Sequence, residues 1–456
     1  CVTVEILNTH LSTLGYRAVA ESTQRLLQLR DGNRYRQLPE QSRQRLDKLI
    51  PNFIQLSSQH SDPDATLFRV LALLEGISRR AAYLAFLAEH PQSLTLLTRL
   101  VAASSWAADY LTQHPALLDE LLDAREIYQP PQWQPIDHEL QTRLNDCAND
   151  VERQLDVLRH TQQEQTFHLL AMDLQGLLPL EILSDHLSAL ADLMLQHVLK
   201  LCWDSARKRH RDDAKFAIIT YGKLGGKELG YASDLDIIFL YDDEHPDAPE
   251  NYSRLAQRIN TMLGSYTSSG RLYETDLRLR PNGESGLLVS SIAAFTAYQQ
   301  QHAWAWEHQA LTRARFSAGD LQIGKQFESI RLQVLCQKRD PASLRNEILT
   351  MRKKMHDGHH NDTNLFDIKH DAGGMVDIEF IVQYIVLAHA HQHPQLTENI
   401  GNLALLKLAG ELGIIPFDIV EQTSMLYRQL RQKQHRMRLN NQTHCRVARG
   451  EIDTSA

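Results

Sequence analysis

Residues 216–240 read FAIITYGKLGGKELGYASDLDIIFL, and this stretch decides the fold that we expect. Two short apolar runs, 216–221 and 235–240, flank a connection rich in glycine that includes Gly225 and Gly226. Short runs of apolar and β-branched residues bounded by glycine are typical of strands joined by a loop. The stretch therefore predicts a strand, a glycine-rich loop and a second strand.

Two carboxylates stand at the start of the second run. Asp234 and Asp236 are separated by a single leucine. Because side chains alternate along a strand, both carboxylates face the same side, roughly 6 to 7 Å apart. Such a pair predicts a metal site at this end of the strand.

A third carboxylate follows downstream. Residues 271–280, RLYETDLRLR, alternate between a charged face that includes Asp276, Arg278 and Arg280 and an apolar face. This alternation predicts another strand with one polar side. We expect that strand to lie beside the second run, so that Asp276 completes the site.

The three carboxylates suit a divalent cation. A set of hard oxygen ligands without His or Cys favours Mg²⁺ or Mn²⁺ over zinc, and two such ions about 3.5 to 4 Å apart clamp the oxygens of a phosphoryl displacement. Gly225 and Gly226 allow close approach of the backbone to a phosphate chain. Arg278 and Arg280 offer cations for a triphosphate. We therefore expect the carboxylates to be both catalytic and metal-binding.

Composition excludes several classes of protein. The chain has 456 residues, 43% of them hydrophobic, enough for two to four globular domains. A net charge of −8 argues against general nucleic-acid binding. Five scattered cysteines and no apolar run of about 18 residues favour a reducing cytoplasm and no membrane span. Cys1 in place of Met suggests a piece of a longer polypeptide.

The rest of the chain reads mainly as helix. Helical spacing of apolar residues dominates from 2 to 211, with a proline-rich linker at 129–135. We expect helices again at 251–269 and from 291 onward, through AWAWEHQALTRARF, and a short strand at 366–370. The predicted fold class is α+β and predominantly helical, with a small mixed sheet flanked by N-terminal and C-terminal helical bundles.

Three motifs resemble the nucleotidyltransferase fold of the DNA polymerase beta superfamily. That pattern has an apolar residue and a glycine pair, then two carboxylates around an apolar residue, and a later Asp. Here it corresponds to Leu224-Gly225-Gly226, to the Asp234 and Asp236 pair, and to Asp276. The resemblance implies a nucleotidyltransferase domain over 131–335 with its catalytic core at about 212–300, between a helical connecting or regulatory region, 1–130, and a C-terminal helical domain, 336–456.

Longer stretches are similar to the family of glutamine synthetase adenylyltransferases. They are GKLGGKELGYASDLDIIFLYD, ETDLRLRPNGESG, WEHQALTRAR and FDIKHDAGGMVDIEF. The resemblance, strongest to the C-terminal half of that bifunctional enzyme, implies transfer of AMP from ATP to a tyrosine of glutamine synthetase with Mg²⁺. It also implies that Ser233 contacts a phosphate, that Lys369 lies near the nucleotide, and that glutamine and a PII-type protein act as effectors.

Other interpretations remain open. The same carboxylates would serve the reverse reaction, phosphorolytic removal of AMP. A template or transfer-RNA nucleotidyltransferase is a second alternative, which the net charge disfavours, and a non-catalytic helical module with a nucleotide-binding core is a third. The basic run 207–211 is either a solvated helix end or a contact for a nucleotide or partner. Trp304 and Trp306 are expected to be buried by an amphipathic helix, with stacking on adenine as the alternative.

Overall fold

The computed structural model describes residues 3–122, 126–148, 150–267, 269–398 and 401–452. Cys1 lies outside the described residues, and Cys147, Cys202 and Cys336 are free thiols. The chain divides into two compact units, each described here by itself. The first comprises Cys1–Pro130, Gln163–Pro179 and Arg436–Thr443, and the second comprises Pro131–Gln162, Leu180–His435 and His444–Ala456.

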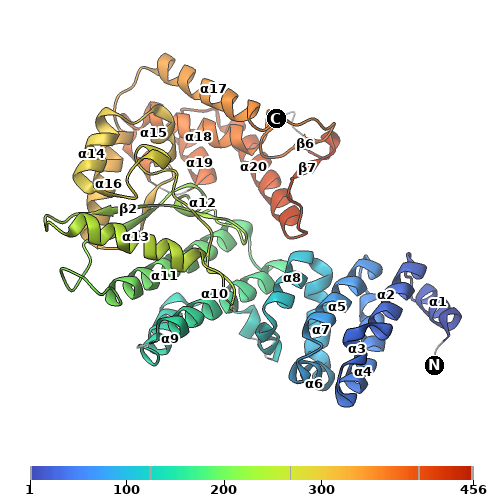
Figure 1. Ribbon diagram of the computed structural model, residues 1–456. Helices are drawn as coiled ribbons and strands as arrows, with labels where there is room; N and C mark the ends of the chain where they lie inside the picture. The colour runs from blue at the N-terminus through green and yellow to red at the C-terminus, as the bar shows by residue number, and fades with distance from the viewer. Residues whose placement is uncertain (1–2, 123–125, 149, 268, 399–400, 453–456) are drawn as a thin grey trace. The chain divides into compact units, whose positions relative to one another are not determined.

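The first unit is helical, as its periodicity predicts (Figure 1). Helix α5 shows why it forms: Asp62 caps it by accepting a hydrogen bond from the Ala65 N–H, and Pro63 takes the first turn, where no N–H is needed. Its buried face packs against α2, α4, α7 and α8. The elements are α1 Val4–Thr13, α2 Val19–Asp31, α3 Asn33–Arg36, α4 Glu40–Ser57, α5 Pro63–Ile77, α6 Ala81–Glu89, α7 Pro91–Ala103, α8 Ser105–Gln113, η1 Pro115–Leu122 and η2 Glu126–Tyr128.

The second unit contains the strands. Helices α10 and α20 each contribute to both units. The elements are α9 Trp133–Asn145, α10 Val151–Leu174, α11 Leu180–Asp204, β1 Phe216–Thr220, α12 Gly222–Gly225, β2 Leu235–Tyr241, α13 Ala248–Gly264, β3 Thr275–Asp276, η3 Gly283–Ser285, β4 Val289–Ser291, α14 Ile292–Gln301, α15 Ala305–Leu311, β5 Arg315–Gly319, α16 Leu321–Leu335, α17 Pro341–Asp357, β6 Phe366–Asp367, α18 Met375–His389, η4 Pro394–Thr397, α19 Asn402–Glu411, α20 Phe417–Arg438, β7 Arg446–Val447 and η5 Arg449–Glu451.

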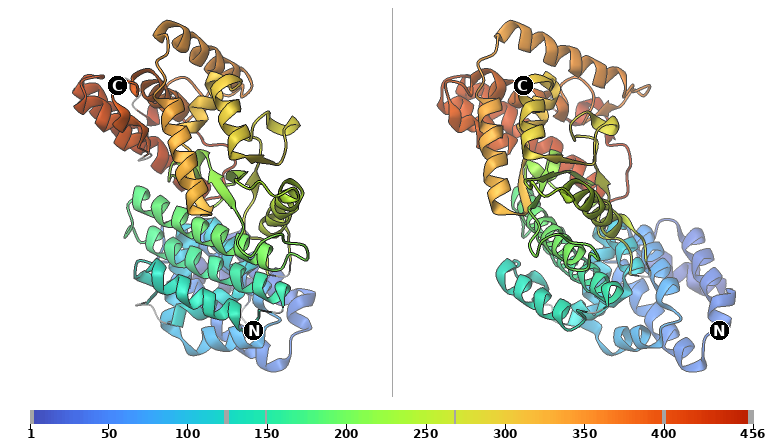
Figure 2. Two further views of the ribbon diagram at one scale, coloured as in Figure 1. Left: turned by 90° about the vertical axis from the view of Figure 1, so that its left-hand side faces the viewer. Right: turned by 60° about the vertical axis from the view of Figure 1, so that its left-hand side comes forward.

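The main sheet is small and mixed, which confirms the predicted α+β class. Its order is β3-β2-β1-β5, and β4 also pairs with β2. β1 runs antiparallel to β2 and β5, whereas β3 and β4 run parallel to β2. Every residue of β1 is buried, because β1 lies between β2 and β5 and helix α16 packs against it (Figure 2). The sheet therefore provides a rigid base for the start of β2.

Several sequence predictions need correction. The connection after β1 begins with a single helical turn, α12, and only the part after it is the predicted loop. The helix predicted to end at Gly270 ends at Gly264. Strand β3 is only two residues long, because the chain turns immediately after it. The helix expected through AWAWEHQALTRARF stops at Leu311, and its last residues start β5, whose pairing with β1 overrides local propensity.

The short strand predicted at 366–370 exists but is only β6. It pairs with β7 in a separate two-stranded sheet, which the sequence reading missed. Helix α18 follows the glycine pair before Met375, as expected. Within the described ranges, no helix combines the length and apolar character that a membrane span requires.

Candidate active site

The parallel pairing of β2 and β3 brings the predicted carboxylates together. Asp236 on β2 is the register partner of Asp276 on β3, and the Leu235 N–H donates to the Glu274 carbonyl at 2.9 Å. Asp234 immediately precedes β2. The side chain of Asp276 is 14% exposed. The three carboxylates therefore share one edge of the sheet.

Asp236 carries the effect of this crowding. Burial, and after it the negative charges of Asp234 and Asp276, raise the pKa of Asp236 to about 6. Nearby cations lower it but do not restore the ordinary value. An excess of negative charge at hard oxygen donors fits a divalent cation. The residues thus match the chemistry of a Mg²⁺ or Mn²⁺ site.

Asp276 is held by an arginine. The Arg278 backbone N–H donates to Asp276 Oδ1 at 2.9 Å, and its Nε donates to Oδ2 at 2.8 Å. These hydrogen bonds lower the pKa of Asp276. Among the described residues, no group of three His, Cys, Asp or Glu side chains already has metal-binding geometry.

The helical turn α12 lies directly against Asp236. Gly222 has a positive φ of 57°, and a Cβ there would stand 2.1 Å from Asp236 Oδ2. No side chain can occupy that position without displacing the carboxylate. Gly222 is therefore a site residue that the sequence reading did not select. Its signal was its place directly after the first strand.

Gly225 and Gly226 have a structural role in addition to the predicted phosphate contact, which stays a prediction. The Gly225 N–H donates to the Tyr221 carbonyl at 2.8 Å, and the Gly226 N–H donates to Gly222 at 3.0 Å. These amides are therefore directed into the turn. A Cβ on Gly225 would stand 2.1 Å from the Arg313 carbonyl oxygen, and one on Gly226 would stand 2.7 Å from the Arg313 Nε. The glycine pair allows Arg313 to approach α12.

A positively charged side chain, Lys223, lies near the carboxylates. Lys223 on α12 donates to Ser233 Oγ at 3.5 Å, and Ser233 Oγ also accepts from the Gly230 N–H at 3.2 Å. Desolvation lowers the pKa of Lys223, and the charge of Lys369 lowers it further, whereas Asp234 acts in the opposite direction. Lys223, which the sequence reading missed, therefore contacts Ser233 and is close enough to Lys369 to be influenced by its charge.

The two predicted arginines do not share a strand face, because both follow β3 in the turn. Arg278 is 69% exposed and touches Asp276. Arg280 instead donates to three backbone carbonyls of the same turn, those of Leu277 at 2.7 Å, Glu284 at 3.0 Å and Gly286 at 3.3 Å. Arg278 can exchange its partner for a phosphate, whereas Arg280 supports the turn.

Behind α12 lies a buried ionic cluster, which we call the Glu228 cluster. Arg313 Nη2 stands 2.6 Å from Glu228 Oε2, and Arg431 Nη1 stands 3.6 Å from Oε1. The Tyr427 hydroxyl lies 3.2 Å from both Glu228 and Glu379. Burial opposes ionisation of Glu228, but the two arginines outweigh it and hold its pKa below the ordinary value. The cluster joins α12 to α18 and α20.

Trp304 and Trp306 contradict their expected burial. They are 69% and 39% exposed. Trp304 precedes α15, and its backbone N–H donates to Glu307 Oε2 at 2.9 Å as part of the helix start. Stacking of either ring on adenine stays a prediction.

Comparison with known proteins gives two matching family models. The model described as glutamate-ammonia ligase adenylyltransferase matches residues 94–330. A second, described as GlnD PII-uridylyltransferase, matches residues 344–445.

Similar curated proteins carry one name, bifunctional glutamine synthetase adenylyltransferase/adenylyl-removing enzyme. The protein of Aromatoleum aromaticum is 55% identical over 96% of this chain and 47% of its own length. Those of Nitrosomonas eutropha and Nitrosomonas europaea are 53% and 54% identical, over 96% of this chain and 48% of their lengths. The chain thus spans about half the length of these relatives.

Proposed function

The chain belongs to the glutamate-ammonia ligase adenylyltransferase family, and from that membership we propose that it transfers AMP from ATP to a tyrosine hydroxyl of glutamine synthetase. Pyrophosphate is the second product. The relatives are named for both addition and removal of adenylyl groups. We assign the forward reaction to this chain because its sequence around Asp234 resembles that of the C-terminal, adenylylating half of the family.

One observation carries the proposal. Asp236 and Asp276 are register partners on parallel strands, with Asp234 beside them, and the pKa of Asp236 is raised to about 6 by burial and by both neighbours. A fold tolerates such uncompensated charge where a cation is to be bound. The three carboxylates would hold Mg²⁺ or Mn²⁺, which supplies Lewis-acid stabilisation of phosphoryl charge when bound.

The cations around α12 would bind the triphosphate. Lys223 is influenced by Asp234, and the exposed Arg278 contacts Asp276, which supports this assignment. Lys369, whose charge lowers the pKa of Lys223, would be the third cation. Ser233 Oγ can donate to a phosphate oxygen, since it accepts from two neighbours in this structure. The Gly222–Gly225 turn holds Lys223 in place through packing, while Arg280 keeps the Arg278 turn in shape.

Asp276 would accept the phenol proton of the substrate tyrosine. A phenol with a pKa near 10 must lose its proton to attack well. In this structure the Arg278 hydrogen bonds lower the pKa of Asp276 and make it a weak base. When Arg278 turns to a phosphate, that stabilisation is withdrawn and the basicity of Asp276 Oδ2 rises. Binding of ATP thereby prepares the proton acceptor.

The helical parts would provide regulation. We assign residues 1–130 to a connecting or regulatory region, residues 131–335 to the nucleotidyltransferase domain and residues 336–456 to a C-terminal helical domain. The match of 344–445 to a PII-uridylyltransferase model supports a link to PII signalling. We propose glutamine and a PII-type protein as effectors.

Incubation with glutamine synthetase, Mg²⁺ and ATP labelled at the α-phosphate tests the proposal. Label should remain on glutamine synthetase, and Asp236→Asn should slow its appearance on the order of a thousandfold, since a metal ligand contributes several kcal/mol. Glu274→Gln, an exposed acid beside β3 paired with Arg271, is the matched control and should retain activity.

The same preparation separates the alternatives. If phosphate releases ADP from adenylylated glutamine synthetase while ATP leaves no label on the unmodified protein, the chain carries the reverse activity. Label that requires added nucleic acid indicates a template or transfer-RNA enzyme. Near wild-type transfer by Asp236→Asn contradicts the carboxylate mechanism.

A further inference from the structure

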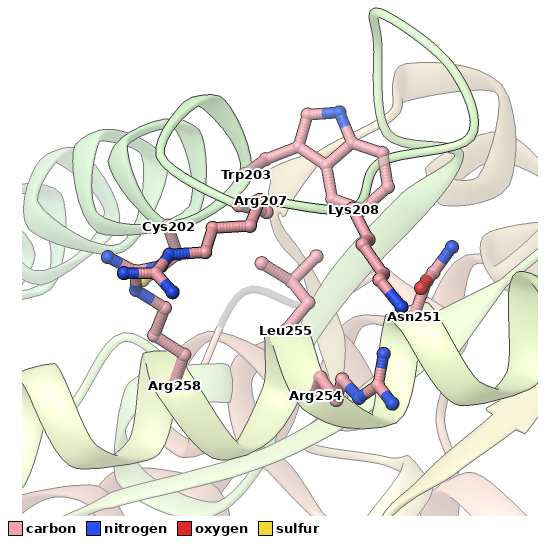
Figure 3. Close-up of a pocket in the computed structure, with 9 residues that line it drawn as sticks. Cys202, Trp203, Arg207, Lys208, Asn251, Arg254, Leu255 and Arg258 are labelled. Atoms are coloured by element: carbon pink, nitrogen blue, oxygen red, sulfur yellow. The ribbon is translucent and has the colours of Figure 1, made fainter.

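A basic pocket lies on the second unit between the end of α11 and helix α13. Its volume is about 360 Å³, and four cations line it: Arg207, Lys208, Arg254 and Arg258. Figure 3 shows Arg207 directed toward Arg258 on one side of Leu255, and Lys208 directed toward Arg254 on the other. None of its described lining residues is an Asp or Glu. The pocket is thus rimmed by positive charge over an apolar floor.

The charges of the pocket differ from those of the adjoining basic segment. Arg209 stands 3.5 Å from Asp204, and Arg211 stands 2.8 Å from Asp243, so both have carboxylate partners. In the described part of the chain, exposed Arg207 and Lys208 form no ion pair. The cations that have no partner are therefore those that face the pocket.

The remaining two cations keep donors available. Arg258 donates one N–H to the Ser205 carbonyl at 3.3 Å, which leaves most of its guanidinium unused. Arg254 is paired with Glu250, one turn earlier on the exposed side of α13. Arg207, Lys208 and Arg258, which have no carboxylate partner among the described residues, repel one another unless an anion lies between them. Planar guanidinium groups bind phosphate oxygens in pairs.

The pocket wall is rigid. The Trp203 indole is 3% exposed, donates to the Asp212 carbonyl at 2.8 Å and stacks on Tyr252 with ring centroids 5.5 Å apart. Leu255 is 4% exposed at the floor. A ligand would therefore meet a preformed apolar base rimmed by cations, an arrangement common in sites for small molecules.

We propose that this pocket binds a small molecule that carries at least two linked phosphate groups, at a site separate from the candidate catalytic carboxylates. The concave shape favours a compact ligand over an extended acidic peptide. The opposed pairs Arg207–Arg258 and Lys208–Arg254 place positive charge on two sides, which suits two linked phosphates better than one.

Helix α13 connects the pocket to β3. Asn260, two residues after Arg258, hydrogen-bonds the Thr275 hydroxyl, and Thr275 adjoins Asp276. A ligand that draws Arg254 and Arg258 inward acts on the helix that supports this strand. If the proposed function holds, occupancy of the pocket changes the rate of AMP transfer. Binding itself does not depend on that function.

Calorimetric titration of the full chain with inorganic pyrophosphate, in buffer with EDTA, tests the proposal. We expect saturable binding that weakens about tenfold or more in the double variant Arg207→Gln/Lys208→Gln, since a hydrogen bond to a charged group contributes a factor of that size. Arg209→Gln is the matched control from the same segment and should bind like the parent. A single Arg207→Glu variant, at an exposed unpaired side chain, guards against misfolding of the double variant.

Three outcomes would overturn the proposal. Equal affinity in the parent and in both pocket variants removes these cations from the binding site. If Lys369→Gln loses pyrophosphate binding while the double variant keeps it, the ligand binds at the candidate active site instead. Tighter binding of a hexaglutamate peptide than of pyrophosphate, sensitive to the same cations, indicates an acidic segment of a partner protein.

Discussion

Two acidic groups flank the short helix α12 and differ in how their charge is compensated. On one side, Asp236 lies with Asp234 and Asp276, and its pKa is raised to about 6 by burial and by the two neighbours. On the other side, Glu228 is more deeply buried, yet Arg313 and Arg431 hold its pKa below the ordinary value. Burial alone therefore does not distinguish a candidate metal-binding carboxylate from one that stabilises the fold.

The difference separates function from stability. In the Glu228 cluster, every charge has an opposite charge or a hydrogen-bond donor nearby, so the cluster locks α12 to α18 and α20. At the start of β2, Asp236 lies near the like charges of Asp234 and Asp276, and a bound divalent cation would compensate them. One group holds the helical turn in place so that the other can keep its excess charge.

Removal of the compensated charge should have the largest effect on folding. Glu228→Gln leaves Arg313 buried with only Glu379 at 3.5 Å as an acidic partner. We expect a loss of about 3 kcal/mol in the free energy of unfolding, because breaking a buried pair strands the other charge. Chemical denaturation of the parent and the variant measures this difference in the free energy of unfolding.

Glu274→Gln is the control for that measurement, since its ion pair with Arg271 lies at the surface and should contribute less than about 1 kcal/mol. A similar small loss for Glu228→Gln would show that the cluster is not a support.

Removal of the uncompensated charge should have the opposite sign. In EDTA, Asp236→Asn should stabilise the protein by about 2 kcal/mol above pH 6, after allowance for the partial exposure of this side chain. The folded pKa of about 6 exceeds the ordinary value of 3.8. Ionised Asp236 therefore destabilises the fold, a cost absent below about pH 4 and complete above pH 6.

Thermal unfolding of parent and variant from pH 4 to 8 checks this pH dependence. The two curves should coincide at the acidic end and diverge between about pH 4 and pH 6. Parallel curves would mean that folding does not raise the pKa of Asp236.

The two arginines after β3 should give the smallest effects. Arg280→Gln should cost about 1 to 2 kcal/mol, because three carbonyls lose their donor. Arg278→Gln removes an exposed partner of Asp276 and should cost less than about 1 kcal/mol. In the proposed reaction, Arg278→Gln should instead raise the KM for ATP, as initial rates would reveal. Equal losses of stability would contradict their different roles.

The sequence predicted the parts of the site that are local. The β1 and β2 runs and the strand that carries Asp276 follow from short apolar runs and period-two patterning, and the expected pairing of that strand with β2 is confirmed. The extent of β3 did not follow, because Arg278 continues the alternating pattern while the chain already turns. A charge pattern does not report where backbone pairing ends.

Long-range contacts were beyond the reach of pattern reading. Arg313 meets Glu228 across 85 positions, and Tyr427 meets it across 199. Lys223 reads as an ordinary solvated lysine until Lys369 and Asp234 are brought near it. The structural role of Gly225 and Gly226 likewise depends on the position of Arg313. Residues whose role is set by a distant partner leave no local periodicity.

Gly222 has a consequence for how this segment tolerates mutation. Its positive φ and the 2.1 Å between a Cβ there and Asp236 Oδ2 exclude every other amino acid for two independent reasons. In a scan of all single substitutions, position 222 should be as intolerant as the carboxylates themselves. A residue with no functional group would then score as catalytic, because its missing atom is the space that the carboxylate occupies.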